Sequence, residues 1–267
     1  MPNKGLRFFG TNYNSSQFSN TYDASSLSAN AGFAFDGLIS TRWISSGENT
    51  DGNSVYLECD YGFNRTLDCF YCYNTNIDDI KFQYWNGASF TDVTSSNATI
   101  VKSSNEAYIF AKLNTSITTD IVRIVGSNTI TPNEEKYVTL FYAFEEIGQF
   151  KYFPDFQPKI SPKQNVFETT DGRDFVIERG ESFSAKIEMK SHINQDDIDL
   201  AEELLARREP FHIWANGGDD SIFRFSFRPF RFQDLIKVTI VGFNEPSFTK
   251  NYYKSGYNNT INISEVV

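Results

Sequence analysis

The side chains that most often carry enzymatic chemistry are scarce in this sequence. There are two histidines, His192 and His212, and neither stands in a nucleophile elbow or a metal-binding His motif. Adjacent carboxylates at 78–79 and 219–220 have the chemistry of a glycosidase pair. Both pairs stand among turn-forming residues, where solvated Asp is the ordinary finding. We therefore predict that the protein has no catalytic residues and is not an enzyme.

The three cysteines do not indicate a functional site either. Cys69 and Cys72 have the CxxC spacing, but one such pair is not a zinc site, and in a strand the two side chains point to opposite faces. Cys59 leaves the total odd at three. We predict that all three are small core residues in a reducing compartment.

The segment Phe223–Phe232 alternates Phe with Arg. This pattern suits a platform for single-stranded nucleic acid, but the net charge of −10 opposes a polyanionic partner. A strand with Phe packed inward and Arg facing outward explains the alternation better. We predict that Arg224, Arg228 and Arg231 lie at an interface between subunits.

The composition excludes several classes of protein. Hydrophobic residues make up 40% of the 267 residues, and 26 Phe with 14 Tyr are enough to build a core. No apolar run approaches the roughly 18 residues of a membrane-spanning helix. The segment Met1–Arg7 lacks the apolar run of a signal peptide. We expect no membrane insertion.

The first part of the chain, residues 1–150, consists of short apolar runs separated by turn signals. One example is Lys81–Trp85, followed by the hairpin turn Asn86–Gly87. No window shows a helical period of apolar residues. The pattern predicts an antiparallel β-sandwich or β-barrel.

The second part differs in composition and in its elements. Three prolines in Phe153–Pro162 interrupt any helix or strand, so residues 151–162 are predicted to be a linker. A helix is predicted at about 195–208, with Asn194 as its N-cap. The whole chain is therefore expected to be mainly β. Its second domain is predicted as a β-barrel or sandwich with that one helix at 163–250, followed by a C-terminal extension at 251–267.

A motif near the N-terminus carries a family resemblance. Ala34–Trp43 contains Ala-Phe-Asp-Gly followed by Thr, one residue and Trp, and it is similar to the start of discoidin domains. These are the coagulation-factor type C, galactose-binding-like jelly rolls. Further segments fit in order, namely Tyr56–Gly62, Phe82–Phe90, Ile121–Ile124 and Phe144–Ile147. The resemblance covers about residues 8–150.

The resemblance implies a structural Ca²⁺ beside the Asp-Gly turn. The matching positions are Asp36, Thr41 and Glu146, while Leu38 stands where a side-chain oxygen is common. Ca²⁺ takes about six to eight oxygen ligands. No other cofactor is expected.

The resemblance also implies binding of sugars or lipids through loops. Sugar binding needs exposed aromatic rings and polar groups that fix the orientation of the ligand. The sequence alone does not select such a set. The aromatic residues available are Tyr13, Tyr22, Trp43, Trp85 and Tyr108.

The second half resembles a different family. Arg179–Ser184, an acidic helix, Pro210–Trp214 and Gly242–Phe248 occur in an order that looks like the tail-tube-like β-barrel of phage distal tail and baseplate proteins. In that family the barrels assemble into rings and attached domains project outward. The resemblance implies a homo-oligomer, with partners among other tail proteins.

Taken together, these features predict a structural virion protein of a phage tail, baseplate or related contractile machine. The N-terminal domain would contact neighbouring proteins or host surface glycans, and assembly would take place in the host cytoplasm. The alternative is a carbohydrate-binding or adhesive module at a cell surface.

Overall fold

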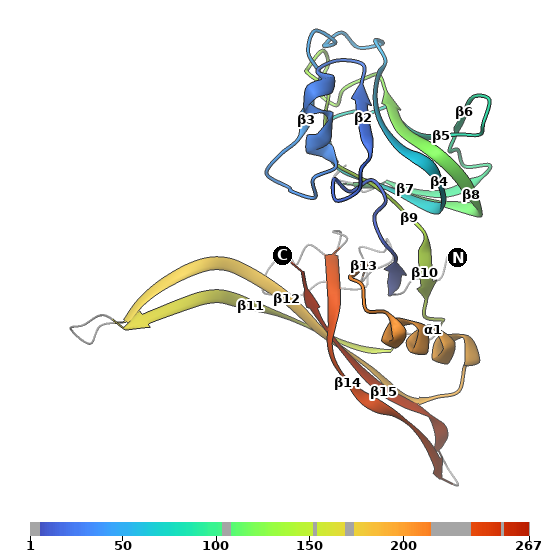
Figure 1. Ribbon diagram of the computed structural model, residues 1–267, viewed down its shortest axis with the longest axis vertical. Coiled ribbons are helices and arrows are strands. Elements are labelled where there is room, and N and C mark those ends of the chain that lie inside the picture. The colour runs from blue at the N-terminus through green and yellow to red at the C-terminus, as the bar shows by residue number, and fades with distance from the viewer. Residues whose placement is uncertain are drawn as a thin grey trace. The chain divides into compact units, whose positions relative to one another are not determined.

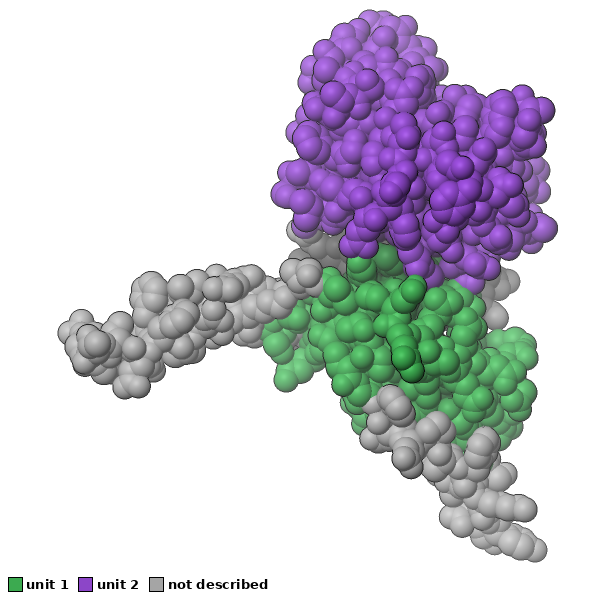
Figure 2. All heavy atoms as spheres, in the orientation of Figure 1, with its two compact units in different colours: residues 1–9, 147–267 green, residues 10–146 purple. Residues whose placement is uncertain are grey.

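The computed structural model divides the chain into two compact units (Figure 2). Unit 2 comprises Gly10–Glu146, and unit 1 comprises Met1–Phe9 together with Ile147–Val267. The structure describes residues 6–102, 108–151, 154–168, 174–214, 236–251 and 254–266.

Unit 2 is an antiparallel β structure (Figure 1). Its strands pair in the order β3-β9-β4-β8-β5-β6, with β2 paired to β4 and β7 paired to β8. A 3₁₀ helix, η1, spans Ser28–Ala34. The strands are β2 (Thr21–Ala24), β3 (Trp43–Ile44), β4 (Val55–Thr75), β5 (Ile80–Trp85), β6 (Phe90–Asp92), β7 (Ala98–Lys102), β8 (Tyr108–Gly126) and β9 (Tyr137–Phe144).

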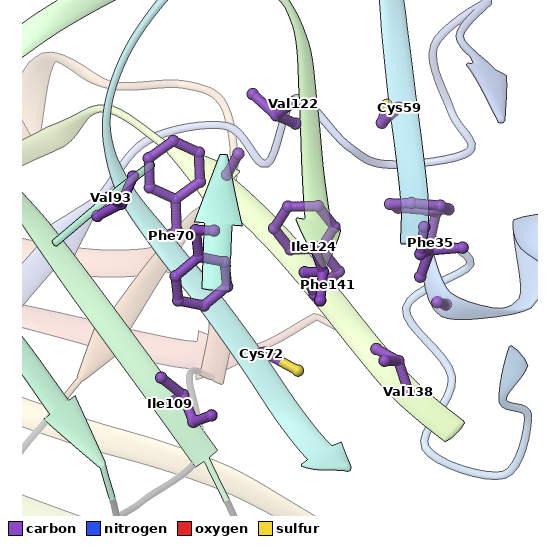
Figure 3. Packing of buried hydrophobic residues seen from close by; sticks show 14 of the residues in the cluster. Phe35, Cys59, Phe70, Cys72, Val93, Ile109, Val122, Ile124, Val138 and Phe141 are labelled. Carbon is purple, nitrogen blue, oxygen red and sulfur yellow. The ribbon is translucent and has the colours of Figure 1, made fainter. Parts of the chain in front are cut away.

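The core of unit 2 is built by alternate residues of these strands. Phe82 stacks with Phe70 and Phe141, with ring centroids 5.6 and 5.8 Å apart. Phe35, which follows η1, contacts Phe141 at 5.9 Å and is fully buried. Trp43 is also fully buried in this cluster. Figure 3 shows Phe35, Phe70 and Phe141 among the aliphatic side chains of the same cluster. The aromatic content predicted to build a core therefore does so.

Unit 1 contains a second antiparallel sheet, in the order β10-β1-β13-β14-β15-β12-β11. One α-helix, α1 (Gln195–Ala206), is present among the described residues. The strands are β1 (Arg7–Phe9), β10 (Glu146–Gln149), β11 (Asp155–Glu168), β12 (Asp174–His192), β13 (Phe211–Trp214), β14 (Ile236–Asn251) and β15 (Lys254–Glu265).

Helix α1 begins as the sequence predicts. The Asn194 side chain accepts a hydrogen bond from the Asp197 N–H at 3.1 Å, which confirms the N-cap. Ile198, Ala201 and Leu204 are buried on the face toward the sheet. The helix ends at Ala206, two residues earlier than predicted, because Arg207 is already extended, with φ −73° and ψ 127°.

The structure differs from the predicted linker at 151–162. Asp155–Glu168 forms β11, which pairs with β12 from Asp155↔Glu188 onward. β11 is the last strand of its sheet, and an edge strand tolerates proline because one row of its N–H groups needs no partner. A register shift directly after Pro162, between Pro162 and Gln164, accommodates this proline in the strand.

The ends of the chain also differ from the predicted boundaries. Arg7–Phe9 pairs with β13, so the first residues belong to the C-terminal sheet and not to the domain predicted at 1–150. The predicted extension at 251–267 contains β15, which lies between β14 and β12 in the sheet. Ile261 and Ile263 of β15 are each 1% exposed, so this segment contributes to the core of unit 1.

The predicted fold class is confirmed, because the described residues are mainly antiparallel β with one α-helix. In the same residues, no helix combines the length and the apolar character needed to cross a membrane. The predicted interface arginines Arg224, Arg228 and Arg231 lie outside the described residues.

Candidate functional site

The turn predicted at Asp36–Gly37 is present. One carboxylate oxygen of Asp36 accepts a hydrogen bond from the Leu38 N–H at 2.8 Å, and the other accepts one from the Thr41 hydroxyl at 2.6 Å. Gly37 adopts φ +79°, a conformation that glycine reaches without strain. Asp36 and Thr41 are therefore brought together as predicted, in a turn that they close themselves.

Glu146, the third predicted calcium ligand, has a cationic neighbour. Its carboxylate lies 3.2 Å from the Lys112 ammonium, which also pairs with Asp68. Asp68 in turn accepts a hydrogen bond from the Glu146 N–H at 2.8 Å. The side chains of Asp68 and Glu146 are only 9% and 12% exposed, so this is a largely buried ionic cluster.

These residues fit a calcium ion only in part. Ca²⁺ requires about six to eight oxygen ligands, and the Lys112 ammonium already neutralises charge at Glu146. Among the described residues, no group of three or more His, Cys, Asp or Glu side chains is placed to hold a metal ion. Calcium binding stays a prediction from the resemblance.

The aromatic residues available for sugar stacking divide into buried and accessible sets. Trp43 and Tyr108 are 0% and 1% exposed, and the Trp43 indole N–H donates to the Ser26 carbonyl at 3.1 Å. Tyr22 stacks on Phe35 with ring centroids 4.5 Å apart. Tyr13 and Trp85 are partly exposed, and each lies in a group of rings near an arginine.

The first group is the Arg65 cluster, formed by Tyr13, Phe18, Phe63 and Arg65. The Arg65 guanidinium carbon lies 3.9 Å from the centroid of the Phe63 ring, 4.8 Å from that of Tyr13 and 5.5 Å from that of Phe18. The Tyr13 and Phe18 rings are tilted against each other at 6.3 Å. Phe63 is 55% exposed, so a large apolar ring is offered to solvent beside a cation.

A break in strand β4 positions Phe63 and Arg65. Asp60 pairs with Ile121 and Arg65 pairs with Thr119, so residues 61–64 of β4 stand opposite a single residue of β8. Gly62 takes φ +70° in this bulge, and its N–H donates to the Asp60 carboxylate at 2.7 Å. The bulge thus projects Phe63 from the sheet.

Two asparagines, the buried Asn14 and the partly exposed Asn20, hold the segment that carries Tyr13 and Phe18. The Asn14 amide donates to the Phe141 carbonyl at 3.2 Å, and its oxygen accepts from the Tyr61 hydroxyl at 2.6 Å. The Asn20 amide donates to the Tyr13 carbonyl at 2.7 Å. Asn14 is fully buried, so the segment is anchored to the core. Tyr13 and Phe18 are therefore held in place by the N-terminal segment, whereas Phe63 and Arg65 are held in place by strand β4.

The Arg65 side chain lacks polar and charged partners among the described residues. Its Nε atom is buried and has no hydrogen-bond partner, and its guanidinium has no ion pair among the described residues. A buried donor without a partner costs about 1–3 kcal/mol relative to a satisfied one. The Nη groups of Arg65, which also have no partner among the described residues and are not buried, are the donors that stand next to the exposed ring.

In the second group, the Arg123 side chain has a hydrogen-bond partner and an ion-pair partner. The Arg123 guanidinium lies 3.5 Å from the centroid of the Phe90 ring, and its Nε donates to the Gln83 side chain at 2.6 Å. It also lies 3.8 Å from the Glu58 carboxylate. Burial raises the pKa of Glu58, while Arg123 lowers it. This arginine serves as a cross-strand link on the sheet surface.

The loops at 46–53 and 128–136 are satisfied internally as well. The Asp51 carboxylate accepts hydrogen bonds from the N–H and the hydroxyl of Thr129, at 3.1 and 3.0 Å. The fully buried Lys136 donates its ammonium protons to the carbonyls of Glu48 and Thr50. The polar groups of these two loops bond to one another. Fewer of their donors and acceptors are therefore open to a ligand than in the Arg65 cluster.

The predicted role of the cysteines is confirmed in its structural part. Cys59, Cys69 and Cys72 are fully buried and free. Burial raises the pKa of each thiol, so none is poised as a nucleophile. His212 is 5% exposed in β13, and the side chain of His192 lies outside the described residues.

Sequence reasoning did not single out Phe18, Phe63 or Arg65. One signal was available, because Gly62-Phe63-Asn64 places a large apolar residue in a turn-forming context. The convergence of residues 13, 18 and 65 on that ring depends on the fold.

Comparisons with known proteins returned structural neighbours only. No family model matches the chain, and no curated protein matches it. One neighbour is the chitosan-binding module 1 derived from a chitosanase/glucanase of Paenibacillus sp. IK-5, with 21% identity, a TM-score of 0.38, and coverage of 50% of this chain and 98% of that one. A second is the family 32 carbohydrate-binding module of C. perfringens NanJ in complex with galactose, with 17% identity, a TM-score of 0.39, and coverage of 47% and 93%.

A third neighbour is the family 32 module of AlyQ in complex with 4,5-unsaturated mannuronic acid, with 22% identity, a TM-score of 0.35, and coverage of 46% and 92%. All three TM-scores lie below 0.5, so we take the function from the residues of the chain itself.

Proposed function

We propose that unit 2 binds carbohydrate without catalysing its conversion, and that the Arg65 cluster holds the sugar. The observation that carries this proposal is the Phe63 ring, which is 55% exposed yet fixed 3.9 Å from the Arg65 guanidinium. This function corresponds to the alternative predicted from the sequence.

The chemistry of a sugar matches this arrangement. A pyranose has an apolar face of C–H groups and a rim of hydroxyls, so its recognition combines an aromatic ring with a few placed polar groups. The guanidinium covers one face of Phe63, and the exposed remainder of the ring is free to receive the apolar face of a sugar. The Nη groups of Arg65 have no partner among the described residues and are not buried as Nε is, so they are donors for sugar oxygens.

The proposal is tested on an array of immobilised oligosaccharides, probed with the full chain. We expect Phe63→Ala to reduce retention on the bound glycans about tenfold or more, because the stacking surface is lost. Phe33→Ala is the matched control, since Phe33 is also an exposed phenylalanine of unit 2, at 44%. The proposal fails if wild-type protein binds no glycan, or if both variants behave alike.

Assembly into an oligomer is a second candidate function, and it is the one that the phage-tail prediction requires. It is supported by the pairing of residues 164–168 with 174–178, to which no third strand is added among the described residues. A two-stranded ribbon is marginal alone in water and gains stability by packing on a partner. Light scattering of the full chain tests this candidate: we expect a mass above 30.5 kDa, and a strict monomer would oppose it.

A further inference from the structure

We propose that the ligand of the Arg65 cluster is an acidic sugar, whose carboxylate or sulfate group pairs with the Arg65 guanidinium. This inference rests on the carbohydrate-binding function proposed above and narrows its ligand class.

The first argument is the missing counter-charge. The chain carries 34 acidic against 24 basic residues, so carboxylates are in excess. Arg123, which also stacks on an aromatic ring of unit 2, has Glu58 at 3.8 Å. The Arg65 guanidinium has no such partner among the described residues.

The second argument is the environment of the cation. Three aromatic rings lie within 5.5 Å of the Arg65 guanidinium carbon, the side chain is only partly exposed and its Nε atom is buried. Contacts with aromatic rings stabilise the cation but leave its N–H donors unused. A charge-assisted hydrogen bond is stronger in such a partly desolvated site than in water.

The third argument is the geometry of the group. A guanidinium presents a planar fork of N–H donors that matches the two oxygens of a carboxylate, or two oxygens of a sulfate. A neutral hydroxyl fills only one of these donors. An acidic sugar can therefore stack on Phe63 and accept hydrogen bonds from the Nη groups of Arg65 at the same time, since these groups have no partner among the described residues and, unlike Nε, are not buried.

Calorimetric titration of the full chain tests the inference with three probes of equal length. These are a galacturonic acid tetrasaccharide, the neutral tetrasaccharide of the same linkage, and a sulfated galactose tetrasaccharide, so that carboxylate and sulfate are compared directly. We expect one of the acidic probes to bind at least about tenfold more tightly than the neutral one. We also expect this preference to weaken as salt is added.

The variants separate a specific contact from general charge. Arg65→Met keeps an apolar side chain of similar length and should abolish the preference for the acidic probe. Arg65→Lys keeps the charge but not the fork, and should retain only part of it. Lys81→Gln removes one positive charge from an exposed ion pair elsewhere on unit 2 and should leave the preference unchanged.

The possible outcomes are distinct. Equal binding of the acidic and neutral probes by wild-type protein overturns the inference while carbohydrate binding stands. An acidic preference that survives Arg65→Met, or that is lost equally in Lys81→Gln, overturns it too. Absence of binding to all probes, together with an empty glycan array, removes both the inference and the proposed function. If Arg65→Met does not fold by circular dichroism, Arg65→Lys decides.

Discussion

At the residue scale, two arginines of unit 2 show how neighbours decide a role. Both stack on aromatic rings, but Arg123 is also held by Gln83 and Glu58, whereas the guanidinium of Arg65 has neither a hydrogen bond nor an ion pair among the described residues. The side-chain type is the same in both cases. The difference lies in what the fold places beside each guanidinium, and it makes one a structural link and the other a binding candidate.

The hydrogen bond between Tyr61 and Asn14 anchors the segment that carries Tyr13. Both side chains are buried, and the oxygen–oxygen distance is 2.6 Å. Tyr61→Phe leaves the Asn14 oxygen without this donor, so we expect a loss of about 1–3 kcal/mol in the free energy of unfolding. Urea unfolding measures it. Tyr84→Phe is the control, because the Tyr84 hydroxyl makes no hydrogen bond within the described residues, and an equal loss there would contradict the account.

Tyr22 makes part of the stability dependent on alkaline pH. Burial, with a smaller contribution from Cys59, raises the pKa of Tyr22 from 10.0 to about 12. The folded protein thus holds this proton at pH values where the unfolded chain releases it. The contribution to stability is complete below pH 10 and is lost as the pH rises toward 12.

We expect Tyr22→Phe to remove that dependence. The free energy of unfolding of the variant should fall less between pH 10 and 12 than that of the wild type, as followed by urea unfolding at each pH. An ultraviolet titration should also lose one tyrosine with a midpoint near 12. A variant with the wild-type pH dependence and an unchanged titration would show that Tyr22 does not titrate in this way.

At the element scale, the bulge in β4 sets the candidate site. Residues 61–64 stand opposite one residue of β8, and this irregularity turns Phe63 outward. Gly62 and Asn64 are turn-forming residues, so the local sequence marks an irregularity at this point. In the structure β4 continues through the bulge from Val55 to Thr75. Local pattern therefore located the irregularity but not its consequence for the site.

Gly62 is the residue on which the bulge depends. Its φ of +70° disfavours side chains, although a Cβ there would meet nothing within 4 Å. We expect Gly62→Ala to cost about 1 kcal/mol through backbone strain alone, measured by urea unfolding. Gly62→Asn should cost less, because Asn tolerates the left-handed region. An Ala variant as stable as the wild type would mean that the bulge readily takes another conformation.

The predictability of each element follows from where its determinants lie. Helix α1 was predictable, because its cap at Asn194 and its apolar stripe are local in sequence. β11 was not, because prolines argue against a strand unless that strand lies at a sheet edge, and edge position is a property of the sheet. The Arg65 cluster was missed for the same reason, since Tyr13 and Phe63 meet only in the folded chain.

At the scale of the whole molecule, the N-terminal strand belongs to the same sheet as the C-terminal part of the chain. Its first described strand, β1, completes a sheet whose other strands come from residues 146–265. Phe8 of that strand is fully buried and packs edge-on against Phe150 at 5.5 Å. The intervening residues 10–146 form unit 2 as an insertion between β1 and the rest of unit 1.

We expect Phe8→Ala to destabilise unit 1 by about 3–5 kcal/mol, as for other large-to-small core substitutions. Hydrogen-exchange mass spectrometry should show faster exchange in β12, β13 and β15, with little change in β4 and β9. Phe70→Ala, in the core of unit 2, should give the reverse pattern. Equal acceleration in both units for either variant would contradict the division of the chain.

The most direct test of the central claim is a crystal structure of the full chain with the oligosaccharide that it binds most tightly. We expect a sugar ring stacked on the exposed side of Phe63, with a polar or anionic group of the ligand bonded to Arg65. A sugar bound instead beside Arg123, or in the loops at 46–53 and 128–136, would show that the Arg65 cluster is not the binding site.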